Sequence, residues 1–256
     1  MSIAVITPTY NAQYYIKGWY ENIKNFADEI IVCDTGSTDD TLKYLDTVTD
    51  PRLKVMHGRM DSPYEWDEGN VRNMMLDECK SKYILALDVD EMVGSDFLEF
   101  YEYILVHDNV EHKDQFYIAR FTHLSFWDNM QTIRLNQLWP IFSKHEWKGE
   151  TKINFLLDFR GFYPRRMGRL FRNHPDVRYE DKGNHSMITY KNWPARFALR
   201  HPVISINPGV CFYHFHYACP QQNPIENRAH QRGKKWKTIP FWGELPDEIK
   251  YYGTVK

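Results

Sequence analysis

The stretch IVCDTGSTDDT, residues 31–41, sets the pattern for the first half of the chain. Its β-branched start predicts a short buried strand that ends at the carboxylate of Asp34. Small residues follow, and Ser37 or Thr38 can cap a helix predicted over residues 39–48. A buried strand that ends on an acid and turns into a capped helix has two interpretations. It is either a simple packing arrangement or the place where a small polar ligand is held.

Working outward from this stretch, apolar runs and helical periodicities alternate along the chain. Strands are predicted at residues 3–8, 29–34, 52–58 and 82–91, and helices at residues 12–26, 39–48 and 67–81. This alternation predicts βαβ units and a mostly parallel sheet with right-handed crossovers. A further helix is predicted after Ser95, which is a favoured cap. Longer strands are predicted at residues 115–127 and 135–144, and loops from residue 159 onward.

The composition indicates one globular α/β domain over residues 1–256. With 43% hydrophobic and 16% aromatic residues, the chain can bury a sizeable core. We divide the domain into a first half with the alternating pattern typical of nucleotide-binding folds, residues 1–95, and a more irregular half, residues 96–256. No internal repeat or low-complexity linker separates the two.

Charge is distributed unevenly along the chain. Residues 1–100 hold 9 basic against 19 acidic side chains, whereas residues 160–200 hold 10 against 3. The two regions could face each other across a cleft that takes an anion. Solvated surfaces of opposite sign are the alternative.

The spacing of the cysteines and the hydropathy of the chain indicate the cellular compartment of the protein. The four cysteines, with no CxxC pair, indicate reduced thiols and a cytoplasmic protein. The N-terminus has no basic region before its short apolar run, so we expect no signal peptide. Residues 201–225 lack charged side chains but contain four prolines, which argues against a membrane span. Peripheral membrane contact stays open.

Three of the predicted strands end in polar motifs: TPTYN, DTGSTDD and DVDE. Ligands of open parallel sheets bind beyond the carboxyl ends of the strands. The turn after the first strand has no glycine, and no P-loop motif occurs, so neither standard phosphate-binding loop is present. Asp88 and Asp90 would lie on one side of an extended segment, where a cation such as Mg²⁺ or Mn²⁺ relieves their repulsion. The alternative is that the pair only caps a neighbouring helix.

Taken together, the motifs VITPTYNA, IVCDTGSTDDT, DEGNVRN and ALDVDE resemble the successive landmarks of family 2 glycosyltransferases of the bacterial and phage type. RLFRN and YHFHYACP are similar to later landmarks, whereas residues 92–165 match none. The resemblance implies a GT-A fold: a Rossmann-like α/β/α sandwich with a mostly parallel central sheet and an irregular, acceptor-binding second half.

The resemblance also implies roles for individual residues. The implied nucleotide-sugar site comprises Thr7, Pro8, Tyr10, Asp34, Arg72, Asp88, Arg169 and Arg172. Asp34 would accept an N–H of the base, typically uracil, and Asp88 would contact the ribose. Asp90 would ligate Mn²⁺ or Mg²⁺, and Asp88, His214 and His216 are further candidate metal ligands. For several of these residues a structural role is the alternative: Thr7 and Tyr10 can pack or cap, the histidines can be held in an aromatic core, and the arginines can face water.

The catalytic base is the least defined of these residues. Many relatives carry a His-Glu pair after the RLFRN segment, but here Ser186 stands where the glutamate would be. We therefore expect the base to be Glu180 or Asp181, which lie among ten basic residues. Positive surroundings would keep such a carboxylate ionised.

The sequence thus predicts a metal-dependent, inverting glycosyltransferase. It would move a sugar from a nucleotide-diphospho sugar, most often UDP-linked, to a hydroxyl group on a glycan, lipid, protein or modified nucleobase. A nucleic-acid acceptor would suit the basic and aromatic segment HQRGKKWKT, which an ordinary surface helix can also contain. Two alternatives are a catalytically inactive sugar-nucleotide or glycan-binding module, and an enzyme that builds nucleotide sugars.

Overall fold

The structure is a computed structural model of the 256-residue chain. It describes residues 2–58, 68–103, 118–127, 132–135, 144–147, 150–153, 165–182, 185–190, 193–194, 203–204, 211–218, 237–240 and 245–252.

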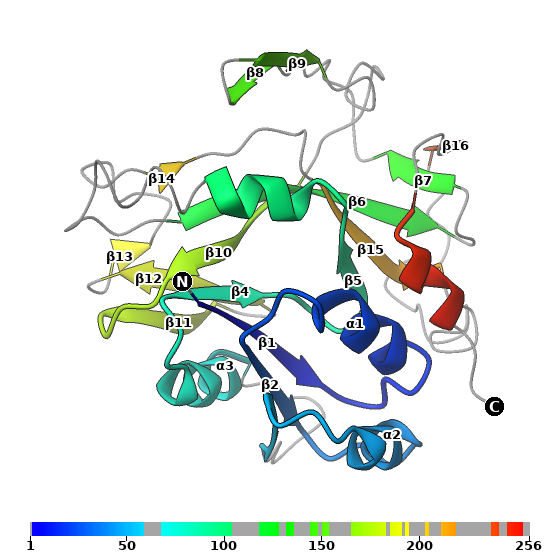
Figure 1. Ribbon diagram of the computed structural model, residues 1–256, viewed down its shortest axis with the longest axis vertical. Coiled ribbons are helices and arrows are strands. Elements are labelled where there is room, and N and C mark those ends of the chain that lie inside the picture. Colours follow the sequence, from blue (N-terminus) through cyan, green and yellow to red (C-terminus); the bar gives the residue numbers. More distant parts are fainter. Residues whose placement is uncertain are drawn as a thin grey trace.

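The first half of the chain folds as alternating strands and helices, as predicted (Figure 1). In order, these elements are β1 (Ile3–Thr9), α1 (Ile16–Ile23), β2 (Glu29–Asp34), α2 (Thr41–Thr47), β3 (Leu53–His57), α3 (Glu68–Glu78), β4 (Tyr83–Ala86) and β5 (Glu91–Val93). Residues 97–103 form the next described helical turns.

The second half is mostly strands. They are β6 (Ile118–Trp127), β7 (Thr132–Leu135), β8 (Lys144–Trp147), β9 (Glu150–Ile153), β10 (Arg165–Arg172), β11 (Val177–Lys182), β12 (His185–Tyr190), β13 (Trp193–Pro194), β14 (Val203–Ile204), β15 (Cys211–Tyr217) and β16 (Lys237–Pro240). A 3-10 helix, η5 (Asp247–Tyr251), follows.

The central sheet joins both halves of the chain. Its main path runs β16-β7-β6-β10-β4-β1-β2-β3, with β14 and β15 also paired to β6. The strands β1 to β4 are parallel to one another, and β10 joins them antiparallel between β4 and β6. The α/β class and the parallel arrangement predicted for the first half are confirmed.

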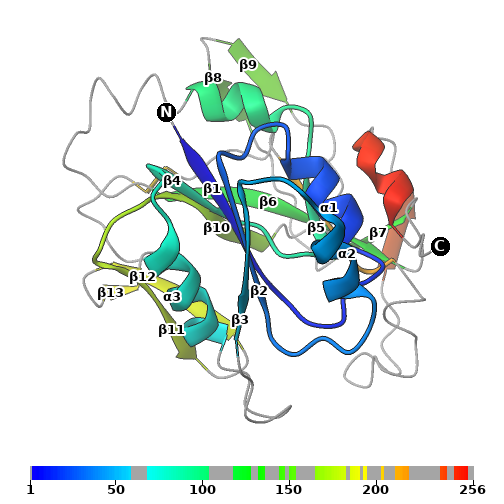
Figure 2. The same cartoon turned by 60° about the horizontal axis from the view of Figure 1, so that its bottom comes forward.

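Two apolar layers cover the two faces of this sheet (Figure 2). Because side chains alternate along a strand, Val5 and Ile30 point to the side of the sheet covered by α1 and α2, where they pack in one cluster with Trp19. Ile6 and Ile31 point to the opposite side, which α3 covers. The β11–β12 hairpin packs beside α3 and supplies buried aromatic and aliphatic side chains to that second layer. The sheet is therefore buried on both faces, and its strand ends are the places left for polar chemistry.

The loops expected from residue 159 onward were predicted wrongly, because the described part of that region contains β10, β11 and β12. In β10 the register with β6 shifts between Gly168 and Leu170. This bulge interrupts the two-residue alternation by which a strand is recognised in a sequence. The strand predicted at 115–127 is confirmed as β6, whereas most of 135–144 lies outside the described residues.

Oppositely charged regions of the chain are in direct contact. Arg178 Nη2 lies 2.9 Å from Asp77 Oδ1, and Arg169 Nη2 lies 2.7 Å from Asp88 Oδ2. Some of the charge asymmetry between the two halves is therefore neutralised across their junction. Within the described ranges, no helix has the length and apolar character needed to cross a membrane.

Candidate metal and nucleotide site

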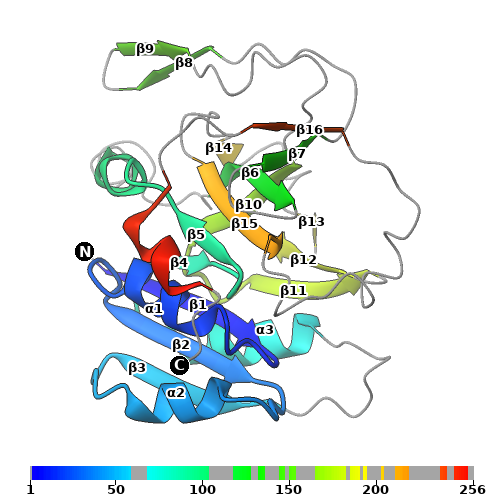
Figure 3. The same cartoon turned by 90° about the vertical axis from the view of Figure 1, so that its right-hand side faces the viewer.

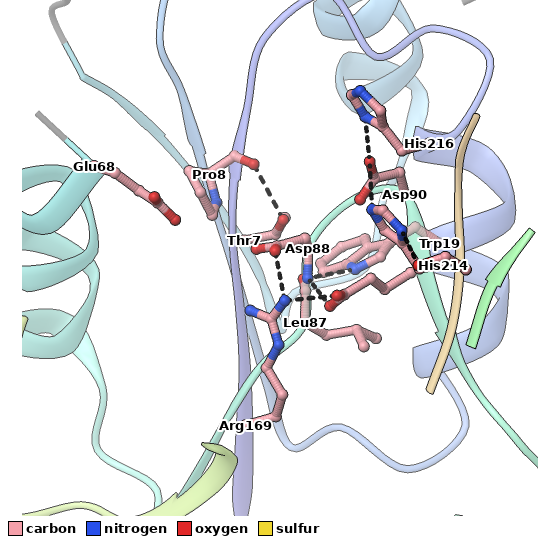
Figure 4. Close-up of polar contacts among 12 residues, drawn as sticks. Thr7, Pro8, Trp19, Glu68, Leu87, Asp88, Asp90, Arg169, His214 and His216 are labelled. Atoms are coloured by element: carbon pink, nitrogen blue, oxygen red, sulfur yellow. Dashed lines mark hydrogen bonds and ion pairs between the residues drawn. The ribbon is translucent and has the colours of Figure 1, made fainter. Parts of the chain in front are cut away.

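Polar side chains gather where β1, β2 and β4 reach their carboxyl ends (Figure 4). The motif that follows β4 contains Asp88 and Asp90 and leads directly into β5. β15 pairs antiparallel with β5, so that His214 lies opposite Glu91. This pairing brings β15, from the second half of the chain, next to the DVDE motif of the first half.

Asp90, His214 and His216 form a compact set of metal-ligand atoms, all within 4.8 Å of one another. Asp90 Oδ2 lies 2.9 Å from His216 Nδ1 and 3.6 Å from His214 Nε2. Adjacent ligands of an octahedral ion with bonds of about 2.1 Å are separated by roughly 3 Å. A carboxylate and two imidazoles at this spacing fit a divalent transition metal.

Neighbouring groups fix the orientation and charge of these three residues. Ser125 Oγ lies 3.3 Å from His214 Nδ1, which leaves His214 Nε2 directed at Asp90. Burial disfavours the charged form of Asp90, but the two histidines outweigh it and hold the pKa of Asp90 well below its usual range. Burial lowers the pKa of His214, and the charge of Asp90 reverses this, so that the pKa is raised.

Asp88 belongs to a different set of contacts from Asp90. Its Oδ1 accepts a hydrogen bond of 2.5 Å from Arg72, and its Oδ2 accepts one of 2.7 Å from Arg169. Burial opposes ionisation of Asp88, but Arg169 and Arg72 together hold its pKa below the ordinary value. These contacts make Asp88 an ionised anchor between α3 and β10, separate from the three candidate metal ligands.

Glu91 completes the contacts around Arg169. Its Oε1 accepts a 2.6 Å hydrogen bond from Arg169 Nη2, and its Oε2 accepts a 3.0 Å bond from the backbone N–H of Asp88. The Glu91 side chain is 1% exposed and that of Arg169 is 6% exposed. One guanidinium and one buried carboxylate thus hold both ends of the turn that carries Asp90.

Asp34 lies buried at the end of β2, directly beside Thr9 of β1 in the parallel register. Its Oδ2 accepts hydrogen bonds of 2.9 and 3.0 Å from the backbone N–H groups of Gly36 and Ser37. In the described part of the chain, neither Asp34 Oδ1 nor Thr9 Oγ1 has a hydrogen-bond partner. Buried polar atoms without a partner are costly and mark places where a ligand can supply one.

Known proteins and protein families are similar to this chain. The family model described as glycosyl transferase family 2 matches residues 4–198 of the chain. The chain belongs to glycosyl transferase family 2. Its α/β architecture is the GT-A fold expected of that family.

Two bacterial proteins are similar to part of the chain. An uncharacterized glycosyltransferase of Haemophilus influenzae is 30% identical over 107 residues, which cover 38% of this chain and 39% of that protein. Chondroitin synthase of Escherichia coli is 31% identical over 102 residues, which cover 38% of this chain and 14% of the synthase. The chain thus matches well under half the length of either relative.

Solved structures give a weaker likeness. A crystal structure of Staphylococcus aureus TarS residues 1–349 in complex with UDP-GlcNAc is 22% identical, with a TM-score of 0.41. That match covers 56% of this chain and 39% of the TarS chain.

In this family 2 chain, the three candidate nucleotide-binding residues of the TPTYN motif differ in their access to a ligand. Two of them, Thr7 and Pro8, lie within β1. Thr7 is fully buried, and its hydroxyl donates to the Pro8 carbonyl at 3.2 Å. Pro8 is buried in the same strand. Tyr10 is 47% exposed just beyond the strand end. Of these three residues, Tyr10 offers an accessible side chain, and Thr7 has the packing role left open above.

The two arginines predicted from RLFRN lie at different places along β10. Arg169 is buried against Asp88 and Glu91, so its role is to hold the acidic motif. Arg172 is half-buried and pairs with Tyr83 at the amino end of β4. The structure therefore does not bring Arg172 to the strand ends where the other candidate residues meet.

The candidate base residues lie on β11, which packs beside the helix that carries Arg72. The Tyr179 backbone exchanges two hydrogen bonds with Asn73 of α3, and the Arg72 guanidinium lies 5.5 Å from the Tyr179 ring centroid. Glu180 follows Tyr179 and is half-buried, whereas the side chain of Asp181 lies outside the described set. The strand is thus tied to the helix that carries Arg72.

Sequence reasoning missed Glu91, Ser125 and Thr9 as members of the site. Glu91 stands in the quoted DVDE motif, so its position next to Asp90 was a usable signal. Thr9 likewise stands inside TPTYN. Nothing in the sequence around Ser125 marks it, because its contact with His214 spans 89 residues.

Proposed function

We propose that the protein is a metal-dependent glycosyltransferase that moves a sugar from a UDP-sugar to a hydroxyl acceptor, with inversion at the anomeric carbon. The observation that carries the proposal is the cluster of Asp90, His214 and His216 at the carboxyl end of the sheet. The three side chains come from both halves of the chain and meet beyond the carboxyl ends of the parallel strands, where ligands of open α/β sheets bind.

Uracil selection is assigned to Asp34 and Thr9. The free Oδ1 of Asp34 can accept the imide N–H of uracil, and the Thr9 hydroxyl can donate to a neighbouring carbonyl of the same base. Tyr10, exposed beside them, offers a ring on which the base can stack. Adenine and guanine do not present this pattern of one N–H flanked by two carbonyls.

Arg72 and Asp88 are assigned to the ribose and diphosphate. The Arg72 side chain is 3% exposed, and its Nη1 has no hydrogen-bond partner in the described part of the chain. Its other nitrogens are held by Glu68 and Asp88. A guanidinium fixed in this way can present its remaining N–H groups to phosphate oxygen, and Asp88, which is 30% exposed, can accept from a ribose hydroxyl.

Mn²⁺ is the favoured ion for Asp90, His214 and His216. Oxygen ligands suit Mg²⁺, whereas two imidazoles favour a transition metal. When bound, such an ion would neutralise charge on the leaving diphosphate. The protein's own contribution is the orientation of His214 by Ser125 and the ionised state of Asp90.

The acceptor hydroxyl needs a base, which we assign to Glu180 or Asp181 of β11. The name of the E. coli relative, a chondroitin synthase, favours a carbohydrate acceptor. A lipid, a protein and a modified nucleobase are the other acceptors considered. We place the reaction in the cytoplasm, where nucleotide sugars are supplied, with peripheral contact to a membrane if the acceptor is a lipid.

Calorimetric titration of nucleotide diphosphates, with and without Mn²⁺, tests the proposal. We expect UDP to bind more tightly than ADP, GDP or CDP, and Mn²⁺ to increase its affinity. Asp34→Ala should weaken UDP binding, whereas sugar phosphates without a base should bind the variant and the parent equally. Equal affinity for all four nucleotides, unaffected by Mn²⁺, would contradict the proposed function.

A further inference from the structure

The last described segment of the chain, η5, packs against α1 (Figure 3). η5 lies against α1, where Lys17 Nζ is 4.8 Å from the centroid of the Tyr251 ring and Asn22 Nδ2 is 3.5 Å from Glu248 Oε2. Tyr252, the residue after η5, is 7% exposed. This tyrosine belongs to none of the motifs assigned to the nucleotide or the metal.

The Tyr252 hydroxyl reaches the backbone on both sides of Asp90. It lies 3.3 Å from the carbonyl oxygen of Val89 and 3.4 Å from that of Glu91. The Tyr252 ring packs edge-to-face on Phe215 at 5.2 Å. Phe215 stands between the two histidines, and its backbone N–H donates to the Asp90 carbonyl at 2.8 Å. A single side chain therefore contacts both segments that carry the candidate ligands.

A second tyrosine, Tyr15, also contacts β15, the strand that carries His214 and His216. The Tyr15 hydroxyl lies 3.3 Å from the carbonyl oxygens of Phe215 and His216. Its ring packs edge-to-face on Tyr252, with centroids 5.1 Å apart. The two tyrosines form one aromatic unit that touches backbone next to Asp90 and His216.

Gly18 provides the space that Tyr252 occupies. A Cβ added at Gly18 would lie 2.3 Å from Tyr252 Cδ1 and 2.5 Å from Cε1. Glycine is less favourable than alanine in the interior of a helix such as α1. The sequence thus carries an unfavourable helix residue where the tyrosine ring must approach the helix.

We propose that Tyr252 is a positioning residue that holds the Asp90 turn and the His214–His216 strand at metal-binding distance. The proposal rests on the proposed function, because it assumes that these residues bind a divalent metal. Groups that orient metal ligands commonly contribute 10- to 100-fold to metal affinity. Rigid backbone matters most here because the ligands come from segments far apart in the chain.

Mn²⁺ affinity, measured by electron paramagnetic resonance of the free ion, tests this role without relying on activity. Tyr252→Phe keeps the ring and removes the hydroxyl, so we expect it to fold normally and to bind Mn²⁺ about 3- to 10-fold more weakly. Gly18→Ala displaces the ring while favouring the helix, and should weaken Mn²⁺ binding by about 10- to 100-fold. Tyr251→Phe is the matched control and should bind as the parent does.

The outcomes separate the two proposals. If the parent binds Mn²⁺, Asp90→Asn does not, and both Tyr252→Phe and Gly18→Ala are weakened, the positioning role is supported. If the parent binds Mn²⁺ and both variants bind it equally well, the role of Tyr252 is overturned and the proposed function stands. If the parent binds no Mn²⁺ in the presence of UDP, the proposed function fails and the inference fails with it.

Discussion

Arg169 Nη2 donates to Asp88 at 2.7 Å and to Glu91 at 2.6 Å, joining a strand of the second half to the acidic motif of the first. The guanidinium is buried, and burial alone would lower its pKa, but the charges of Asp88 and Glu91 raise it. The three groups form an ionic network that is buried at Arg169 and Glu91 and partly exposed at Asp88.

Removing Arg169 should therefore be costly for the fold. Arg169→Leu leaves two carboxylates close together without their shared cation, and we expect a loss of about 3–5 kcal/mol in the free energy of unfolding. Urea denaturation measures this loss. Arg178→Leu removes an exposed ion pair with Asp77 and a hydrogen bond to the Val177 carbonyl, and it should cost less than the loss of Arg169. Equal stability of the two variants would contradict the network.

The three candidate metal ligands should show a preference among ions. Because two of the three candidate ligands are imidazoles, we expect Mn²⁺ to bind more tightly than Mg²⁺ in the parent protein. His216→Ala should lose most of this preference, whereas His174→Ala, which changes a histidine outside the cluster, should keep it. Titration of each protein with both ions gives the comparison. A parent that prefers Mg²⁺ would show that the imidazoles are not ligands.

Thr9→Val should separate binding from stability. The Thr9 hydroxyl is buried without a partner in the described structure, so replacing it with a methyl group should leave the fold equally or more stable. The same change should weaken UDP binding if the hydroxyl contacts uracil. Thermal unfolding and calorimetry measure the two effects. A variant with unchanged UDP affinity would remove Thr9 from the base site.

Stability at low pH should depend on Asp50. Hydrogen bonds from the Arg52 side chain lower the pKa of Asp50, although burial opposes them, and Tyr20 also donates to it at 2.9 Å. Because the folded-state pKa lies below the unfolded value of about 3.9, this stabilisation is complete above that pH. It is lost as the pH falls through the folded-state pKa.

Asp50→Asn should therefore be less stable than the parent at neutral pH, and the difference should shrink as the pH is lowered below about 4. Urea unfolding across this pH range measures the difference. Asp46→Asn, at an exposed carboxylate on α2, makes the same charge change away from Arg52 and is the control. A constant difference for Asp50→Asn at every pH would exclude the ionised pair as its cause.

The catalytic base can be identified by separate substitutions at Glu180 and Asp181. Alanine at the true base should reduce the transfer rate by roughly 10²- to 10⁴-fold and leave UDP-sugar binding nearly unchanged. Radiolabelled sugar transfer and calorimetry measure the two quantities. If both variants transfer sugar at the parental rate, the base lies elsewhere on the acceptor side.

The first half of the fold could be predicted because its information is local. Apolar runs such as residues 3–8 and 29–34 are buried parallel strands, and their carboxyl ends carry the polar motifs that gather at the site. Asp90 and the two histidines were proposed as ligands from separate motifs, and the structure places them together.

The second half could not be predicted to the same extent because its order comes from distant contacts. Arg169 looks like a surface residue in the sequence, but its buried position depends on carboxylates 78 and 81 residues away. The bulge near Gly168 hides the strand pattern around it. Tyr252 stands in no local motif, and its proposed role depends on contacts with Gly18 and Val89 in the first half of the chain.

The contact between Asp90 and His216, 126 residues apart, also has a kinetic consequence. β15 completes the cluster by pairing with strands from both halves, so we expect this junction to form late in folding. A ligand held there adds stability that the transition state lacks. We therefore expect Mn²⁺ to slow unfolding markedly while leaving the refolding rate almost unchanged, which makes the bound protein long-lived and more resistant to irreversible denaturation.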